Sequence, residues 1–324
     1  MSDTRLRIVL LAALAIGTAA IAVACGDDDS TGGTTPSVAP DGSSDAIGVP
    51  DTAIADAGTL PDAVVSADAA DANDGASNVV SAFYAVDGAN RLVRFAPTSL
   101  GTIVTLSITG LQAAETIHAV DFRRTDGKLY GLGSTSRLYT IDTTTGAATV
   151  VAATPFTPAL SGTTFAFDWN PVVDRFRVVS DTDQNLRLDP ATGALVAVDT
   201  STTYAIGDVN AAANPAVSGC AYLMANAEAG TTVLYDVDTT LDVLTVQNPP
   251  NNGSLNTVGP LGIDATSSFG FDIVVEGGVD KAYIVTNPGG SAASTLYTVN
   301  LATGAATAVG QVGGAVLHGL THSL

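Results

Sequence analysis

A short phrase of sequence returns five times between residues 91 and 304, and this repetition constrains the fold more than any other feature of the chain. Each copy is an apolar arm, often written Leu-Tyr, that leads into a polar turn, often Thr-Gly. The copies contain Leu92, Leu138, Leu186, Leu234 and Leu296. Their period is roughly 50 residues, which is typical of a β-propeller in which each repeat forms one blade.

The second repeat shows the expected blade most clearly. Its segments 117–122, 128–132, 137–141 and 148–151 alternate apolar and polar residues and are separated by turns rich in Gly and Thr. This pattern indicates four antiparallel strands. Residues 79–324 divided by five give about 49 residues for each repeat, whereas seven blades would leave about 35, too few for four strands and their loops. The predicted fold class is therefore all-β, a propeller with five blades of four antiparallel strands.

The first repeat lacks an inner strand, and the C-terminus supplies a candidate for it. The segment 317–321, LHGLT, is similar to 117–121, IHAVD, which begins the second blade. We therefore expect the C-terminal strand to pair into blade one and close the ring, because closure removes the sheet edges that favour aggregation. The inner strands of blades three, four and five are expected to begin near Phe165, Tyr204 and Phe269.

Residues 1–24 have the pattern of an export signal. Arg5 and Arg7 precede an apolar stretch that is short for a membrane span and ends in small residues suited to cleavage, Ala22-Val23-Ala24. Cleavage would leave Cys25 as the first residue, and this arrangement resembles a bacterial lipobox, with Ala22 where that motif usually has Leu. We expect lipidation of Cys25, which would anchor an exported protein to a bacterial membrane; ordinary secretion is the alternative.

The segment from Cys25 to residue 78 differs from the rest of the chain. After Cys25 it contains eleven Asp and no Lys, Arg, Glu or aromatic residue. Such a composition buries too little apolar surface to fold, so we expect a disordered tether that leads to the propeller domain at 79–324. The formal net charge is −20, and Lys281 is the only Lys or Arg after Arg187. We therefore expect no nucleic-acid partner.

Four aspartates are predicted to share one position at the end of the inner strands: Asp121, Asp168, Asp208 and Asp272. Thr321 takes this place in the closing strand. Carboxylates that converge on the axis are suited to Ca²⁺ or another divalent metal. The alternative is a local role, in which each carboxylate accepts backbone N–H bonds in the turn that follows its strand.

His118 and His318 occupy matching positions in adjacent blades, and His322 is close in sequence to the second. Two imidazoles near the axis are suited to binding a ligand or a transition metal. Phe165 and Phe269 hold the equivalent position in other blades, so apolar packing of the histidines is the alternative interpretation. Cys220, in an apolar run, is expected to be a buried small side chain rather than a reactive thiol.

The third repeat is rich in charged pairs and carries a family resemblance. Asp168, Asp174, Arg175, Arg177 and Arg187 are expected to form cross-strand ion pairs, and an anion site built from the arginines is the alternative. The motifs FDWNPVVDRFRVV (167–179), QNLR (184–187) and PATG (190–193) resemble the bacterial family known as domain of unknown function 4394. This resemblance implies an exported propeller-like domain and no known reaction, so it transfers no catalytic residue.

The sequence lacks a Ser-centred nucleophile motif, a phosphate-binding loop and a paired-cysteine metal motif. We therefore predict a surface or periplasmic lipoprotein that presents its propeller to a protein, glycan or small ligand. The alternative is a metal-dependent hydrolase with its metal in the axial channel.

Overall fold

The computed structural model describes residues 82–323. The predicted signal peptide, Cys25 and the predicted tether lie outside the described residues. Within 82–323 the helices are three short 3-10 turns, η1 (Ala227–Ala229), η2 (Pro250–Asn252) and η3 (Pro288–Gly290). No helix in this part of the chain has the length and apolar character needed to cross a bilayer.

The strands form five antiparallel blades, and in each blade the first strand named is the innermost. Blade one contains β21 (Leu317–His322), β1 (Phe83–Asp87), β2 (Arg91–Ala96) and β3 (Ser99–Ser107). Blade two contains β4 (Ile117–Arg123), β5 (Lys128–Gly133), β6 (Arg137–Ile141) and β7 (Ala148–Val150). Blade three contains β8 (Phe165–Asn170), β9 (Arg175–Ser180), β10 (Asn185–Leu188) and β11 (Leu195–Val198).

Blade four contains β13 (Val217–Tyr222), β14 (Leu234–Asp238), β15 (Val243–Gln247) and β16 (Ser254–Pro260), with β12 (Thr203–Tyr204) added at the outer edge. Blade five contains β17 (Phe269–Glu276), β18 (Val279–Thr286), β19 (Thr295–Val299) and β20 (Ala306–Gln311). The predicted five-bladed propeller is therefore confirmed.

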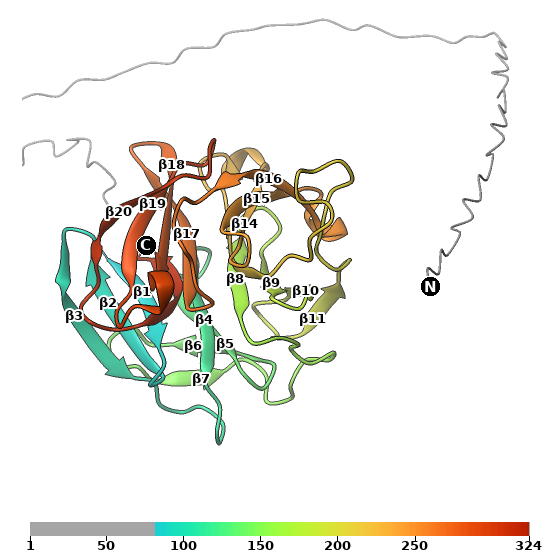
Figure 1. Ribbon diagram of the computed structural model, residues 1–324. Coiled ribbons are helices and arrows are strands. Elements are labelled where there is room, and N and C mark those ends of the chain that lie inside the picture. The colour runs from blue at the N-terminus through green and yellow to red at the C-terminus, as the bar shows by residue number, and fades with distance from the viewer. Residues whose placement is uncertain (1–81, 324) are drawn as a thin grey trace, which may run out of the picture. The chain divides into compact units, whose positions relative to one another are not determined.

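The ring closes through the C-terminal strand, as expected. β21 pairs with β1 in antiparallel register, with Phe83 opposite His322 and Asp87 opposite Leu317. In Figure 1 the blue-green strands of blade one accordingly lie beside the orange and red strands of blade five. The first blade thus takes its inner strand from the end of the chain and its other three strands from the start of the domain.

Blade four corrects one sequence expectation. Its inner strand is β13, not a segment that begins at Tyr204, and Tyr204 lies in β12, which pairs in parallel with β16. The repeated phrase at Leu234 forms the second strand of its blade, whereas the other copies form third strands. Neighbouring antiparallel arms carry the same apolar alternation, so the local pattern does not distinguish a second strand from a third. Cys220 lies in β13 and is 2% exposed, as predicted for a buried packing residue.

The Thr-Gly turns explain why the outer hairpins recur. In the β6–β7 turn, Oδ1 of Asp142 accepts the N–H groups of Thr144 and Thr145, both at 2.8 Å. The chain then passes through Gly146 at φ 76°, a left-handed conformation that costs glycine little. Gly193 and Gly304 adopt the same sign of φ in the matching turns of blades three and five. The turn chemistry thus fixes where each outer strand reverses.

Small residues let the inner strands approach the axis closely. In every blade, the residue two positions before the axial Asp, or before the residue equivalent to it, is small. These residues are Ala119, Ala166, Gly219, Gly270 and Gly319. A Cβ atom added to Gly270 would lie 2.6 Å from the carbonyl carbon of Gly319. Backbone packing therefore fills the middle of the ring, and space remains toward the two ends of the inner strands.

Candidate functional site

Three of the four predicted aspartates meet at one end of the axis. Asp121 in β4, Asp168 in β8 and Asp272 in β17 are all buried, and their carboxylate oxygens lie within 4.8 Å of one another. Each follows a largely buried stretch of its inner strand, IHAV in β4, FAF in β8 and FGF in β17. The common blade geometry therefore brings side chains that are far apart in sequence to one point.

Each of these carboxylates bonds to the next blade around the ring. Oδ2 of Asp121 accepts the N–H of Trp169 at 2.6 Å, and Oδ2 of Asp168 accepts the N–H of Tyr222 at 2.8 Å. Oδ2 of Asp272 accepts the N–H of His322 at 2.7 Å. Backbone N–H groups are thus the donors, as in the expected alternative, but they belong to the next blade rather than to the turn after the same strand. Asp121 in addition accepts the N–H of Phe122, the next residue of its own strand, at 2.8 Å.

Thr321 continues this pattern in the closing strand. Its Oγ1 accepts the N–H of Phe122 at 3.3 Å and its hydroxyl donates to Oδ1 of Asp121 at 2.8 Å. In blade four the equivalent residue is Ala221, which has no side-chain acceptor. The bonds thus link blade five to one, one to two, two to three and three to four.

Asp208 does not belong to this cluster, which corrects the prediction. It lies in the loop after β12, where its carboxylate accepts the N–H and the hydroxyl of Thr257, both at 2.7 Å. The expectation failed because it placed the inner strand of blade four at Tyr204 instead of at β13. Asp208 therefore fastens a loop to the outer strand β16.

The cluster also contains a histidine and an arginine. Nδ1 of His322 lies 2.7 Å from Oδ2 of Asp272, and Nη2 of Arg124 lies 2.5 Å from Nε2 of His322. Because a guanidinium only donates, Nε2 must accept and Nδ1 must carry the proton toward Asp272. His322 therefore bridges the guanidinium of Arg124 and the carboxylate of Asp272. In the sequence, the only indication that His322 belongs to a site was that it lies close to His318, and no pattern indicated a role for Arg124.

Burial makes the ionised form of these carboxyls costly. It raises the pKa of Asp121 to about 7, with the charge of Asp272 as the second cause. Burial, followed by the charges of Asp121 and Asp272, also raises the pKa of Asp168 well above its usual range. Protons, or a divalent cation held by these carboxylates, would relieve the repulsion.

The space around the carboxylates is small. The cavity that they line has a volume of about 10 Å³, enough for a water molecule or an ion. Arg124, Trp169 and Met224 line this cavity and also a larger outer pocket of about 340 Å³. These three side chains therefore form the layer between the carboxylates and the outside.

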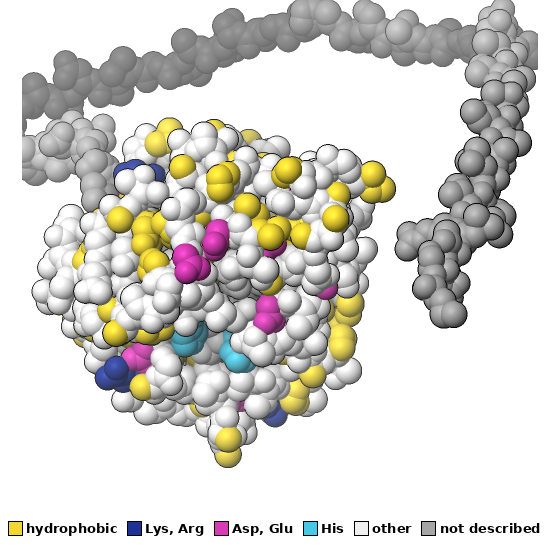
Figure 2. Space-filling view, in the orientation of Figure 1, with side chains coloured by type: hydrophobic (Ala, Val, Ile, Leu, Met, Phe, Trp, Pro, Cys, Tyr) yellow, Lys and Arg dark blue, Asp and Glu magenta, His cyan; other side chains and the backbone are white. Residues whose placement is uncertain are grey.

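The two predicted ligand-binding histidines lie at the opposite end of the inner strands. His118 and His318 line a pocket of about 300 Å³ together with Thr163, Ser218, Ser267 and other residues of the strand starts. The ring of His118 lies 4.6 Å from that of Phe165, and Nε2 of His318 lies 3.2 Å from the carbonyl oxygen of Ile117. Histidine side chains reach the surface on the face drawn in Figure 2.

The histidine pocket is polar but nearly neutral. Burial lowers the pKa of His118, and the nearby His318 lowers it further; burial also lowers the pKa of His318. The one carboxylate in the lining, Asp87, is paired with Arg91 at 2.7 Å. Hydroxyl, amide and neutral imidazole groups therefore dominate this surface. The structure separates it from the aspartates, so the two predicted sites are distinct.

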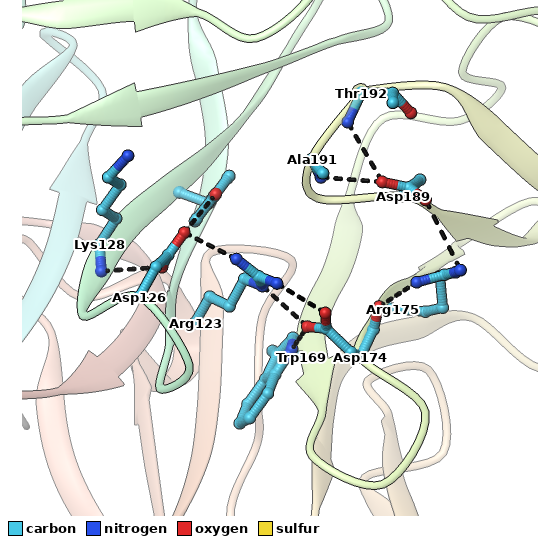
Figure 3. A network of polar contacts seen from close by, with 10 residues as sticks. Arg123, Asp126, Lys128, Trp169, Asp174, Arg175, Asp189, Ala191 and Thr192 are labelled. Carbon is cyan, nitrogen blue, oxygen red and sulfur yellow. Dashed lines mark hydrogen bonds and ion pairs between the residues drawn. The ribbon is translucent and has the colours of Figure 1, made fainter.

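The expected ion pairs of blade three form with other partners. Figure 3 shows Arg123 between Asp126 and Asp174, and the Arg123–Asp174 bond of 2.6 Å joins blade two to blade three. This bond is the main reason why the pKa of Asp174 is lowered. Arg177 and Arg187 both bond to Asp199, which the sequence did not indicate. Asp168 forms no ion pair with an arginine among residues 82–323.

Fold and site together define the protein as a closed five-bladed propeller with buried carboxylates at one end of its axis and a polar pocket at the other. The family model described as "Domain of unknown function (DUF4394)" matches residues 91–321. The chain belongs to this family, as the motifs of the third repeat indicated. No curated protein matches the chain.

Several solved structures are similar at low identity. Kuenenia stuttgartiensis hydrazine synthase is 11% identical, with 61% of this chain and 50% of that chain covered and a TM-score of 0.35. A protein of unknown function from Bacteroides thetaiotaomicron VPI-5482 is 12% identical, with coverage of 71% and 58% and a TM-score of 0.42. Myxococcus xanthus glutaminyl cyclase is 11% identical, with coverage of 68% and 97% and a TM-score of 0.38.

The chain thus spans 50% and 58% of the first two structures. TM-scores of this size carry no argument about activity, so the function must be argued from the residues of this chain.

Proposed function

We propose that this protein is a membrane-anchored lipoprotein that presents its propeller as a binding module. The N-terminal pattern supports the anchor: an apolar signal ends in Ala22-Val23-Ala24 directly before Cys25. Two or more acyl chains on one residue give stable attachment, since each buried CH₂ contributes about 0.8 kcal/mol. The acidic tether would then hold the domain away from an anionic membrane surface.

The pocket around His118 and His318 is the observation on which the binding role depends. Its volume of about 300 Å³ is at the lower end of small-molecule sites. A lining of hydroxyl, amide and neutral imidazole groups beside the ring of Phe165 is suited to a neutral, hydroxyl-rich ligand such as a sugar unit. The ligand class is therefore a neutral glycan.

Detergent phase separation of extracts from cells that express the full chain tests the anchor. We expect the wild-type protein in the detergent phase of a phase-separation assay and the Cys25→Ser variant in the aqueous phase. Cys220→Ser is the matched control, because that thiol is buried inside the propeller. Equal partitioning of wild type and Cys25→Ser would show that the protein is not lipidated.

Ligand-observed NMR with a panel of neutral mono- and disaccharides tests the binding role. Ser267 is exposed and lines the pocket, so Ser267→Trp fills the site at little cost to folding. We expect saturation transfer to at least one sugar in the wild type and its loss in Ser267→Trp. Ser99→Trp, on the outer strand β3, is the control and should bind as the wild type does. Binding of no sugar, or binding that survives Ser267→Trp, would refute the assignment.

A second candidate is a divalent cation at Asp121, Asp168 and Asp272. Three buried carboxylates, each with an oxygen within 4.8 Å of the other two, favour it. The cation would stabilise the ring rather than support hydrolysis, because the cavity of about 10 Å³ leaves no room for a substrate beside it. The metal-dependent hydrolase is therefore the less favoured interpretation of this cluster.

A further inference from the structure

A further pocket lies where blade three meets blade four. It has a volume of about 190 Å³ and is lined by three arginines, Arg175, Arg177 and Arg187. The domain from residue 79 onward contains only ten Lys and Arg residues and carries a net negative formal charge. A pocket that gathers three of them is therefore a marked departure from the rest of the domain.

The other polar groups of this pocket already use their acceptor atoms. Oδ1 of Asn170 accepts the N–H groups of Val172 and Val173 at 2.9 and 3.2 Å. Oδ1 of Asn251 accepts Nη2 of Arg177 at 2.8 Å. These bonds also fix the orientation of both amides, since their NH₂ groups cannot accept. Both amide oxygens in the lining are thus already occupied by N–H donors.

Arg177 is the buried centre of this arrangement. Its side chain is 2% exposed, and its Nε donates to the hydroxyl oxygen of Tyr222 at 3.2 Å. Nη1 of Arg177 bonds to Oδ1 of Asn185 at 2.6 Å and to Oδ2 of Asp199 at 2.7 Å. With Asn251, four partners therefore hold one guanidinium rigidly against the pocket.

The carboxylates that pair with these arginines do not line the pocket. Asp199 bonds to Nε and Nη2 of Arg187 at 2.8 and 2.9 Å, and Asp189 lies 3.6 Å from Nη2 of Arg175, as Figure 3 shows for the second pair. The three guanidinium groups that line the pocket therefore pair with carboxylates that lie outside its lining. Nη1 of Arg187 and Nε of Arg175 have no hydrogen-bond partner among residues 82–323.

We propose that this pocket binds the carboxylate of an organic acid. Three guanidinium groups and no carboxylate line it, and guanidinium groups bind planar oxyanions through paired N–H bonds. Val173, Phe176 and Pro250 form an apolar wall beside the donors, which suits the carbon body of the ligand rather than a free inorganic ion. The site is separate from the histidine pocket, so this inference goes beyond the proposed sugar-binding role and does not depend on it.

Calorimetry and NMR titration of the purified full chain test the inference with five probes. Benzoate and glucuronate carry the carboxylate, benzamide and glucose are their neutral counterparts, and inorganic phosphate is the competing anion. We expect both carboxylates to bind at least about tenfold more tightly than their neutral counterparts, and to bind more weakly as salt is raised. Binding of glucose at the histidine pocket, rather than at the arginine pocket, would be recognised because the Ser267→Trp variant would lose it.

Arg175→Gln is the informative variant, because Arg175 is one-third exposed and its loss leaves the Arg177 network intact. We expect it to weaken carboxylate binding at least about tenfold, with Arg175→Lys intermediate. Arg94→Gln removes the same charge from an exposed position on β2 and should bind as the wild type does.

Several results would overturn the proposal. They are the absence of carboxylate binding in the wild type, equal binding by Arg175→Gln and Arg94→Gln, and equal binding of benzoate and benzamide. Tighter binding of phosphate than of either carboxylate would replace the organic acid with an inorganic anion and so would also refute it.

Discussion

The hydroxyl of Thr321 donates a hydrogen bond of 2.8 Å to Oδ1 of Asp121, a residue 200 positions earlier in the chain. This bond joins the last strand of the domain to the inner strand of blade two. It is one step in a chain of bonds that runs through four of the five junctions between blades. The axial carboxylates therefore connect blades, whatever else they bind.

Removal of this hydroxyl tests how much the closing strand contributes. Thr321→Val is nearly isosteric but leaves Oδ1 of Asp121 and the N–H of Phe122 each without one partner. We expect the free energy of unfolding to fall by about 1–3 kcal/mol, measured by urea denaturation. Thr307→Val, at an exposed position of β20, is the control and should be nearly neutral. Equal stability of the two variants would contradict a structural role for Thr321.

Deletion of residues 317–324 is the stronger test of closure. It removes β21, and blade one then exposes the unpaired edge of β1 to solvent. We expect loss of the cooperative unfolding transition of the whole domain, seen by circular dichroism and calorimetry. A truncated chain that stays compact with an unchanged melting temperature would contradict ring closure as the source of stability.

Asp236 should make stability depend on pH. It is fully buried in β14, neither of its side-chain oxygens has a partner among residues 82–323, and burial raises its pKa to about 8. Because the folded-state pKa lies above the ordinary value, the stabilising effect of its proton is present at acid pH and is lost as pH rises toward 8.

Asp236→Asn should remove this dependence. We expect the variant to unfold like the wild type near pH 4 and to be more stable by on the order of 2 kcal/mol at pH 8, measured by denaturation at both values. Asp142→Asn is the control, because Asp142 is exposed and bonds from the turn N–H groups lower its pKa. A wild-type stability that does not decline between pH 5 and pH 8 would refute the interpretation.

A divalent cation should stabilise the ring through the axial carboxylates. We expect Ca²⁺ to raise the melting temperature more at pH 8 than at pH 5, because protons compete for carboxyls such as Asp121, whose pKa is raised to about 7. Asp168→Asn should abolish the effect of the cation. Asp208→Asn should preserve it, because Asp208 lies in a loop away from the cluster. No shift with any divalent ion would exclude the cation candidate.

The crowded axis predicts a large cost for one added methyl group. In Gly270→Ala, the new Cβ would lie 2.6 Å from the backbone of Gly319, which cannot move without displacing β21. We expect a loss of about 2–3 kcal/mol or failure to fold, measured by thermal denaturation. Gly101→Ala, whose new Cβ would have no neighbour within 4 Å, is the control. Similar melting temperatures for both variants would show that the axis has free space.

The fold was largely predictable because it depends on local patterns that repeat. Alternating apolar residues indicate the strands, and Thr-Gly turns indicate where the chain reverses. The similarity of 317–321 to 117–121 indicates the strand that closes the ring. The places of Asp121, Asp168 and Asp272 followed from the same repetition. The expectation failed at Asp208 because blade four has an extra edge strand, β12, and a repeated phrase shifted to β14.

By itself, the sequence of this protein determined the blade count, the closure of the ring and the place of three of the four predicted axial aspartates. Each of these depends on residues that are close together in sequence or that hold matching positions in the repeats. Only the tertiary structure decided which blade each carboxylate bonds to, that His118 and His318 lie far from the aspartates along the axis, and that Arg124 reaches His322. The physical reason is that these contacts join different blades, and their distances depend on how whole sheets pack around the ring rather than on any local pattern.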